Sequence, residues 1–265
     1  MKGVKRANLF AAGGPFSGDW WIGPLMVILF LAVWEIAPRL GLVNEFFTSR
    51  PSLLLQAAIV DYGSRDFWSD ALVSLVEFGI GFGLALLFGI PLGLLMGSSR
   101  FLREFFTTPL MALYVTPTMV LLPLLIIWVG IGMASRASVA LIAAIFPIII
   151  NIVAGIDQVE KRLLQMAKVF GASWLNILTQ IYIPATLPFL LTGVRLAIGR
   201  AVLTVIAAEM FVSQAGMGFK ITMYGDSMRI DMLLVYVLTV SMFGYLMTRL
   251  VVLLEAKVST WKQIA

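Results

Sequence analysis

Several ionisable side chains of this 265-residue chain fall inside long apolar stretches, where a charge is costly if the stretch crosses a bilayer. The four that we consider candidates for function are Glu77, Arg195, Arg200 and Glu209. A charge at the bilayer centre costs at least about 2.5–3.5 kcal/mol, so each of these groups must face protein or water. Such a residue is by default a candidate for function, and a salt bridge between helices is the structural alternative. For Glu77 both interpretations stay open.

The two arginines are five residues apart in a predicted helix, which corresponds to about 500° of rotation. Arg195 and Arg200 therefore do not share one tight face. Glu77 is a candidate partner for one of them. A basic pair fits an anionic substrate, but we favour a structural ion pair as the role of these two residues.

The apolar stretch 105–129 contains two prolines, Pro117 and Pro123. Each proline removes a backbone donor and bends a helix. A break at membrane depth is tolerated where it lines a cavity or packs against protein. Tyr114 and Thr116 lie beside the first break, so we expect this region to line a substrate path. The predicted translocation pathway comprises Glu77, Tyr114, Thr116, Pro117, Arg195, Arg200 and Glu209.

Several kinds of chemistry have no residues to support them. The chain has no cysteine and no histidine, so thiolate chemistry and the commonest metal ligand and general base are missing. No Gly-Lys pair occurs, so no phosphate-binding loop of the G-x-x-x-x-G-K-[ST] type can hold ATP. We expect no catalytic residue, no metal and no cofactor on this chain.

Composition indicates a membrane protein. Hydrophobic residues make up 60% of the chain and charged residues 12%, and the mean hydropathy is +0.99. Ordinary soluble domains have roughly 45–50% apolar and about 25% charged residues. Long uninterrupted apolar runs favour helices over barrel strands. The net charge of +5 is explained by Lys and Arg that flank membrane spans, so we expect contact with lipid and none with nucleic acid.

The pattern predicts an all-α membrane protein with six transmembrane helices, at about 22–37, 71–96, 105–129, 137–153, 189–212 and 232–254. We divide the chain into an N-terminal lead with the first span and an outer surface segment (1–68), a core of five spans with a loop at 157–184 (69–255), and a tail (256–265). A short helix is expected within 39–68, and another within 213–231.

Glycines four residues apart favour close helix contacts in the second span. They are Gly79 and Gly83, then Gly89, Gly93 and Gly97.

Six spans place both termini on one side of the membrane. That side receives ten Lys and Arg residues against six on the other, among which Arg136 is assigned to an outer turn. The positive-inside rule then predicts that both termini and the 157–184 loop are cytoplasmic, in a plasma (inner) membrane.

The stretch from Gln165 to Pro184 is an amphipathic segment between two predicted membrane spans. Charged residues and good helix formers precede Gly171, and Trp174, Leu178 and Ile181 follow it at helical spacing. Glycine permits a sharp turn, and a proline at the end disfavours helix in the residue before it. The pattern predicts a helix, a turn and a second helix that ends at Pro184.

This stretch resembles the cytoplasmic loop of ABC-importer permeases, whose pattern is E-A-A, three residues, G, nine residues, I, one residue, L-P. Ala167, Gly171, Ile181 and Pro184 match the pattern. Three positions depart from it: Gln165 replaces Glu, Met166 replaces Ala, and Ile183 replaces Leu. The resemblance implies that the contact with an ATPase is made by Gln165, Met166, Ala167, Gly171, Ala172, Ser173 and Trp174.

Other motifs extend the resemblance over about residues 70–255, to the branch that serves nitrate, sulfonate, taurine and thiamine-precursor uptake. They are Gly89-Ile90-Pro91-Leu92-Gly93, Leu122-Pro123-Leu124, Trp128-Val129-Gly130-Ile131-Gly132, Thr192-Gly193-Val194-Arg195-Leu196 and Ala208-Glu209-Met210. The resemblance implies a type I importer permease paired with a second copy or a paralogue. It also implies two ATPase subunits that bind ATP and Mg²⁺, and an extracytoplasmic substrate-binding protein.

Two other functions are weighed against this one. A secondary transporter would use the four intramembrane charges as an ion relay, but such proteins usually show internal repeats and more spans. An intramembrane enzyme would need paired carboxylates, and no Asp falls within the predicted spans.

Overall fold

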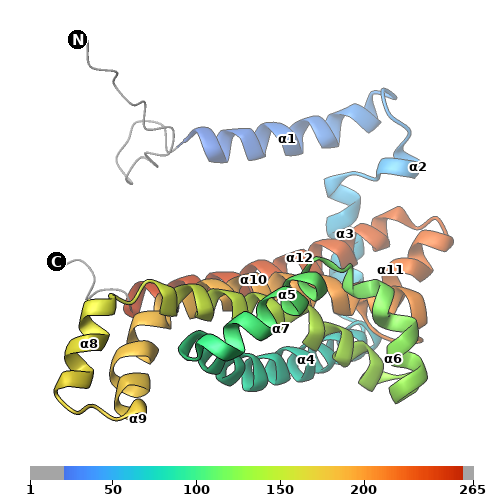
Figure 1. Ribbon diagram of the computed structural model, residues 1–265. Helices are drawn as coiled ribbons and strands as arrows, with labels where there is room; N and C mark the ends of the chain where they lie inside the picture. Colours follow the sequence, from blue (N-terminus) through green and yellow to red (C-terminus); the bar gives the residue numbers. More distant parts are fainter. Residues whose placement is uncertain (1–20, 259–265) are drawn as a thin grey trace, which may run out of the picture.

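All the regular structure in residues 21–258, the part described by the computed structural model, is helical. The long helices are α1 (Ile22–Arg39), α4 (Arg65–Ser98), α5 (Arg100–Val115), α7 (Met133–Asp157), α10 (Ile183–Val212) and α12 (Ile230–Val258). The short ones are α2 (Glu45–Thr48), α3 (Pro51–Tyr62), the 3₁₀-helix η1 (Thr118–Leu121), α6 (Leu122–Val129), α8 (Lys161–Val169), α9 (Trp174–Ile177), the π-helix η2 (Leu178–Tyr182) and α11 (Met217–Asp226). The two short helices expected in 39–68 and 213–231 are confirmed as α3 and α11 (Figure 1).

Helix α7 is the centre of the bundle, and it packs between α4 and α10. Its buried face is built of small and β-branched residues, among them Ala140, Ala144, Ile148 and Ile152. Small residues let backbones approach closely in lipid, where no hydrophobic effect drives helices together. Close packing around α7 is therefore the main source of cohesion in this fold.

The helices α4 and α7 run parallel. A Cβ placed on Gly81 would lie 2.5 Å from the carbonyl oxygen of Ala137, and one placed on Gly97 would meet the side chain of Ile156. Later residues of α4 thus contact later residues of α7, as they do only when two helices run in the same direction. Parallel neighbours begin on the same side of the membrane, so the chain between them must cross back. We therefore interpret the segment α5–η1–α6 as one broken crossing, which together with the five continuous candidate spans agrees with the prediction of six.

That returning span is broken where the sequence predicted. The axes of α5 and the 118–129 segment meet at 94°. Thr116 and Pro117 lie at the break with extended backbone angles, as expected for a residue before a proline. The prediction that Pro123 also breaks the span is wrong. Pro123 lies in the first turn of α6, where its missing N–H costs no helical hydrogen bond.

The glycine prediction holds for one of its two groups. Gly89, Gly93 and Gly97 face the isoleucines of α7, and an added Cβ would crowd them. Gly79 and Gly83 have no atom within 4 Å of an added Cβ, so they do not serve close packing within the described part of the chain.

The second arm of the 165–184 loop differs from the prediction. Helix does not end at Pro184: α9, η2 and α10 form one candidate span over Trp174–Val212. Pro184 lies in the first turn of α10, after the π-helical turn Leu178–Tyr182, and Pro188 lies inside the helix rather than opening it. The π-helical turn directly before Pro184 lets the helix continue through this proline, which has no N–H to donate to the preceding turn.

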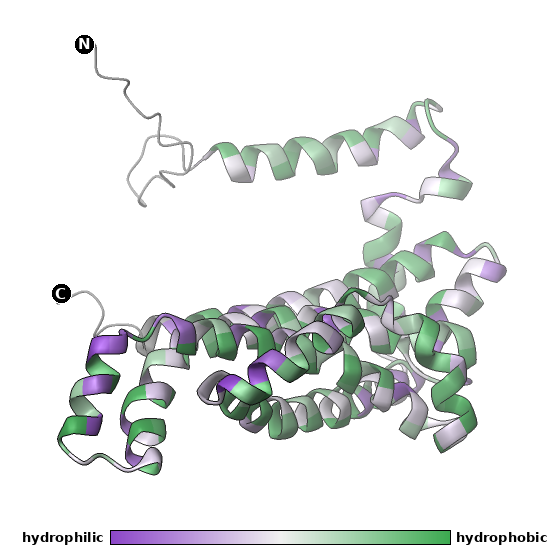
Figure 2. Ribbon diagram, in the orientation of Figure 1, coloured by the Kyte–Doolittle hydropathy of each residue, from purple (hydrophilic) through white to green (hydrophobic). Residues whose placement is uncertain are grey.

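Helix α1 stands apart from the bundle, and only 6% of its apolar window is buried (Figure 1). The α8–α9 loop projects at one end of the bundle, and α6 and α11 lie at the other. Figure 2 shows hydrophilic residues concentrated on α8, whereas the long helices are mostly hydrophobic. The division of the chain at residues 68 and 255 stays a prediction.

Candidate functional site

The turn between α8 and α9 is built around Gly171. This glycine has a φ of +78°, in the left-handed region that side chains rarely adopt. Its N–H donates to the Lys168 carbonyl at 3.0 Å, and the next N–H, of Ala172, donates to the Ala167 carbonyl at 2.9 Å. These two bonds form a Schellman motif, which closes the end of α8. The Ser173 hydroxyl then caps α9 by accepting from the Asn176 N–H at 3.3 Å.

The predicted ATPase-contact residues lie together on this loop. Gln165, Met166 and Ala167 are on the last turns of α8, and Trp174 begins α9. Most are exposed, and α8 buries no residue at all. The loop is therefore a projecting, rigidly turned surface.

Sequence reasoning missed two residues of this surface. Val169 is 85% exposed and Phe170 is 88% exposed, which are the highest values among the large apolar side chains that the structure describes. Met166, Trp174 and Leu175 add to the same apolar tip. The available signal was a pair of large apolar residues directly before the turn glycine of an otherwise polar helix. An apolar patch on a polar, membrane-external loop indicates a protein contact.

At the opposite end of the bundle, Glu77 of α4 forms an ion pair with Arg136 of α7. Arg136 Nε donates to both carboxylate oxygens, at 2.8 and 2.9 Å, and Nη2 donates to Oε1. Glu77 has no exposed surface and Arg136 is also buried. The predicted pairing of Glu77 with Arg195 or Arg200 is therefore wrong. Arg136 had been placed in an outer turn, but α7 begins at Met133 and brings it opposite Glu77.

Three buried side chains cap the beginning of α11. Asp70 and Ser74 belong to α4, and Glu209 belongs to α10. Each side chain accepts a hydrogen bond from one of three consecutive backbone N–H groups: Asp70 from Gly216 at 2.8 Å, Ser74 from Met217 at 2.9 Å, and Glu209 from Gly218 at 2.7 Å. Lys220 of α11 also pairs with Asp70 at 3.5 Å. The predicted pathway residue Glu209 is thus fully buried and holds α11 against the bundle.

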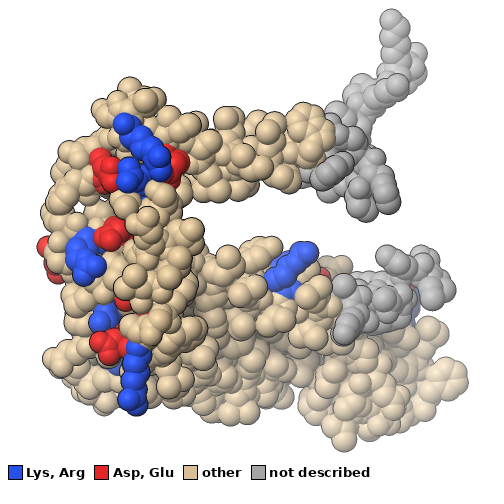
Figure 3. Space-filling view, turned by 180° about the vertical axis from the view of Figure 1, so that it is seen from behind, with Lys and Arg blue, Asp and Glu red and all other residues tan. Residues whose placement is uncertain are grey.

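Charged side chains are unevenly distributed on the surface as well. Figure 3 shows acidic and basic groups side by side at the end where α2, α3 and α11 lie, and a mostly uncharged surface along the rest of that face.

The two arginines of α10 point to different helices, as their spacing predicted. Arg195 pairs with Glu255 of α12, with 3.7 Å between the charged atoms. Glu255 lies near the end of α12, so this ion pair belongs to the same end of the bundle as the α8–α9 loop. Of the two roles considered for Arg195, substrate contact and structural ion pair, the structure shows the ion pair, which joins α10 to α12.

Arg200 has a different environment. Its guanidinium carbon lies 4.2 Å from the centre of the Tyr114 ring, at the end of α5. No carboxylate lies within 4.0 Å of Arg200 among the described residues. A cation–π contact contributes about 0.5–2 kcal/mol, whereas a central charge costs at least about 2.5–3.5 kcal/mol. The ring alone does not offset the cost of this charge.

Thr116 and Pro117 follow Tyr114 at the break of the span. The Thr116 hydroxyl donates to the Ala112 carbonyl at 2.9 Å, and Pro117 is exposed. Tyr114, Thr116, Pro117 and Arg200 thus lie in one region, while Glu77, Arg195 and Glu209 lie elsewhere. Their assignment to a translocation pathway stays a prediction.

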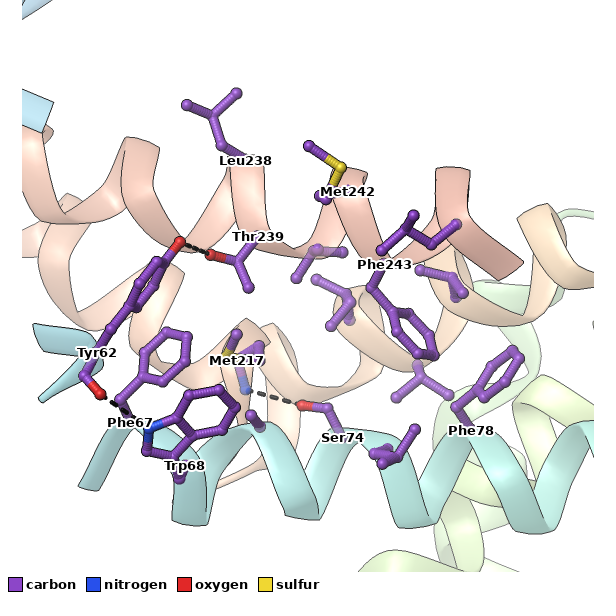
Figure 4. Close-up of a pocket in the computed structure, with 17 residues that line it drawn as sticks. Tyr62, Phe67, Trp68, Ser74, Phe78, Met217, Leu238, Thr239, Met242 and Phe243 are labelled. Carbon is purple, nitrogen blue, oxygen red and sulfur yellow. Dashed lines mark hydrogen bonds between the residues drawn. The ribbon is translucent and has the colours of Figure 1, made fainter. Parts of the chain in front are cut away.

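A cavity of about 510 Å³ lies between α4, α10 and α12. Its lining is apolar, and the few polar groups bond to one another: Tyr62 with Thr239 at 2.8 Å, and the Met217 N–H with Ser74 (Figure 4). No charged side chain lines it in the described part of the chain. The cavity therefore suits hydrocarbon, not a small anion.

Comparison with known proteins identifies the family. Residues 89–260 match the family of binding-protein-dependent transport system inner membrane components. The taurine transport system permease protein TauC of Escherichia coli (strain K12) is 29% identical, over 91% of this chain and 88% of TauC. A putative ABC transporter permease protein of Methanocaldococcus jannaschii is 31% identical, over 89% and 90%. The putative aliphatic sulfonates transport permease protein SsuC of Bacillus subtilis (strain 168) is 27% identical, over 92% and 88%.

Solved structures share the fold. An inward-facing structure of the MetNI methionine ABC transporter has a TM-score of 0.62 and 17% identity, over 71% of this chain and 93% of that chain. A bacterial ABC transporter involved in the import of the acidic polysaccharide alginate has a TM-score of 0.63 and 15% identity, over 91% and 97%. These likenesses support a type I importer permease fold.

The chain belongs to the family of binding-protein-dependent transport system inner membrane components. It is a multi-pass inner membrane protein and a transmembrane permease subunit of an ABC importer.

Proposed function

We propose that this permease moves a small anion, of the sulfonate class, from an extracytoplasmic binding protein into the cytoplasm. One relative is named for the transport of aliphatic sulfonates and another for the transport of taurine, which itself carries a sulfonate group. Alternating access of the helices around the pathway would carry out the movement. A second permease chain, either a copy or a paralogue, would complete that pathway.

The energy source would be two ATPase subunits that bind ATP and Mg²⁺ and dock on the α8–α9 loop. The observation that carries this assignment is the apolar tip at Val169 and Phe170, on a loop held in place by the Gly171 turn. A rigid loop transmits movement of a docked subunit to α10, because α9 and η2 continue directly into that helix.

In this arrangement the α8–α9 loop and both termini are cytoplasmic. The excess of basic residues on that side supports the orientation. The polar cap of α11, at the opposite end of the bundle, would then lie toward the binding protein. The terminal residues 1–20 and 259–265 lie outside the described residues.

The test is purification of the permease from gently solubilised membranes, followed by identification of copurifying subunits and an ATP hydrolysis assay. We expect a nucleotide-binding subunit that is lost when Val169 and Phe170 are both replaced by Asp. The matched control is Lys161→Ser, on the first turn of the same helix. Recovery of the permease alone, without ATPase activity, would contradict the proposal and favour an ion-driven transporter.

A further inference from the structure

We propose that Arg200 and Tyr114 form a contact site for the anionic head of the substrate, a sulfonate or similar oxyanion, halfway across the membrane. This inference rests on the proposed function, from which it takes the anionic substrate. It goes further by naming one residue pair for the permease itself, where selection would otherwise be left to the binding protein.

The first argument is depth. Arg200 lies twelve residues before Val212, the end of α10. At about 1.5 Å per residue this is about 18 Å from the outer end, near the middle of a hydrocarbon core of about 30 Å. Tyr114 is fourteen residues after Arg100, the start of α5, which places it about 21 Å from the inner end. The 4.2 Å contact between the two side chains places them together well inside the span, too deep for the arginine to reach the headgroups.

The second argument is charge. The other buried or half-buried arginines of the bundle each have a carboxylate: Arg136 pairs with Glu77, Arg195 with Glu255, and Arg103 with Asp157. Arg200 has no such partner within 4.0 Å among the described residues. Within the described part of the chain this permanently charged guanidinium thus has no carboxylate partner, and an anionic substrate would supply its counter-ion.

The third argument is geometry. The guanidinium carbon of Arg200 lies over the Tyr114 ring, 4.2 Å from its centre. The N–H donors point outward from the edge of the guanidinium plane, so they stay available to an oxyanion. Such donors bind two oxygens of one anion in parallel, which suits a sulfonate.

The fourth argument is access. The neighbours of Arg200 on the same side of α10, Leu196, Gly199 and Leu203, are exposed. On the other helix the chain turns by 94° directly after Thr116 and Pro117. The chain thus leaves this face of α10 uncovered next to a break in a span. Such breaks occur at membrane depth where they line a cavity or pack against protein.

One test measures transport by the complete complex in proteoliposomes, with its binding protein and with labelled taurine and ethanesulfonate as probes. We expect Arg200→Gln to lower ATP-driven uptake about tenfold or more, because charge-assisted hydrogen bonds are lost. Arg200→Lys keeps the charge but not the planar donors, so uptake should be intermediate. The control Arg249→Gln removes an exposed arginine of α12 and should leave uptake within about twofold. Normal uptake by Arg200→Gln would overturn the inference.

A second test does not depend on the natural substrate, and it uses the absence of cysteine from the chain. Thr116→Cys provides a single thiol two residues after Tyr114, the residue that contacts Arg200. Its reaction rates with an anionic sulfonate-bearing methanethiosulfonate and with a cationic one are then compared. We expect the anionic-to-cationic rate ratio to fall about fivefold or more when Arg200→Gln is added, because the local anion concentration falls. Adding Arg249→Gln should leave the ratio unchanged.

The two tests separate the proposals. If the complex hydrolyses ATP but imports neither probe, the sulfonate assignment fails, and the thiol rates still decide the role of Arg200. A thiol that reacts with neither charged reagent would mean that Arg200 faces lipid or dry protein, and would overturn the inference. A rate ratio that does not respond to Arg200→Gln would overturn it as well.

Discussion

Arg136 and Glu77 join the parallel helices α7 and α4 by an ion pair in which one guanidinium nitrogen lies 2.8 and 2.9 Å from the two carboxylate oxygens. The carboxylate has no exposed surface. A buried pair of this kind gives little net stability compared with apolar residues, but removing one partner leaves an uncompensated charge. The pair therefore specifies how α4 and α7 are aligned.

Neutralising one partner of this pair should destabilise the permease. We expect Arg136→Met alone to lower the free energy of unfolding by about 3–5 kcal/mol, and the double variant Glu77→Leu with Arg136→Met to recover most of it. Thermal unfolding of the purified protein in detergent measures both. Glu104→Gln, which breaks the exposed pair with Arg100, is the control and should have no measurable effect. A double variant no more stable than the single one would show that the pair is not the relevant contact.

Substitution of Gly171 should affect coupling in proportion to the strain it introduces. An added Cβ meets no atom within 4 Å, so the only penalty is the positive φ. Strain of this kind costs of order 1–3 kcal/mol and is greatest for β-branched residues. We expect Gly171→Val to reduce transport per ATP hydrolysed, and Gly171→Asn to behave nearly as wild type because Asn tolerates this conformation. Equal transport by both variants would argue against a role for the turn.

The apolar tip should be required for subunit association and not for folding. Phe170→Ser removes a side chain that is 88% exposed, so the stability of the isolated permease should change by less than about 0.5 kcal/mol. Retention of the ATPase subunit on an affinity column should fall several-fold. Lys161→Ser should retain it. If Phe170→Ser lowers the unfolding temperature as much as it lowers retention, the effect is on folding and the contact is unsupported.

Glycines of α4 should differ sharply in tolerance to alanine. A Cβ on Gly81 would lie 2.5 Å from a backbone oxygen and 2.7 Å from the Ala140 Cβ, so α4 and α7 must separate. We expect Gly81→Ala to cost about 1–3 kcal/mol. Gly83→Ala, which meets nothing within 4 Å, should be neutral or slightly stabilising, because alanine favours helix. Thermal unfolding of the two variants tests this prediction. Similar losses of stability in both variants would contradict the packing of α4 against α7.

The cap of α11 should depend on Gly218. A Cβ there would lie 2.2 Å from the Ile206 carbonyl oxygen and 2.7 Å from the Glu209 Cβ. We expect Gly218→Ala to displace the start of α11 and to expose it to limited proteolysis. Gly225→Ala, near the end of the same helix, meets only a leucine methyl at 3.3 Å and should not. Equal protease resistance of the two variants would show that the cap is not needed to hold α11.

Much of the architecture was predictable because it depends on local or compositional properties. An apolar chain in lipid must satisfy its own backbone, which determines helices, and the apolar runs determine where they lie. The α8–α9 turn was predictable because Gly171 lies between two amphipathic helical segments. Errors came where a local rule has two outcomes. Proline can end a helix, lie in its first turn or be accommodated inside it, so the predictions for Pro123 and Pro184 were wrong.

The pairing of the charges could be decided only by the tertiary structure. Arg136 is 59 positions from Glu77, and Glu255 is 60 from Arg195. Which partner a charge finds depends on the relative direction, rotation and offset of two packed helices, and no local pattern encodes these. The same holds for Arg200, which has no carboxylate partner in the part of the chain that the structure describes; this is visible only once the neighbouring helices are in place. The sequence thus determined which charged side chains need a partner inside the membrane, and the packing of the helices determined which of them have one.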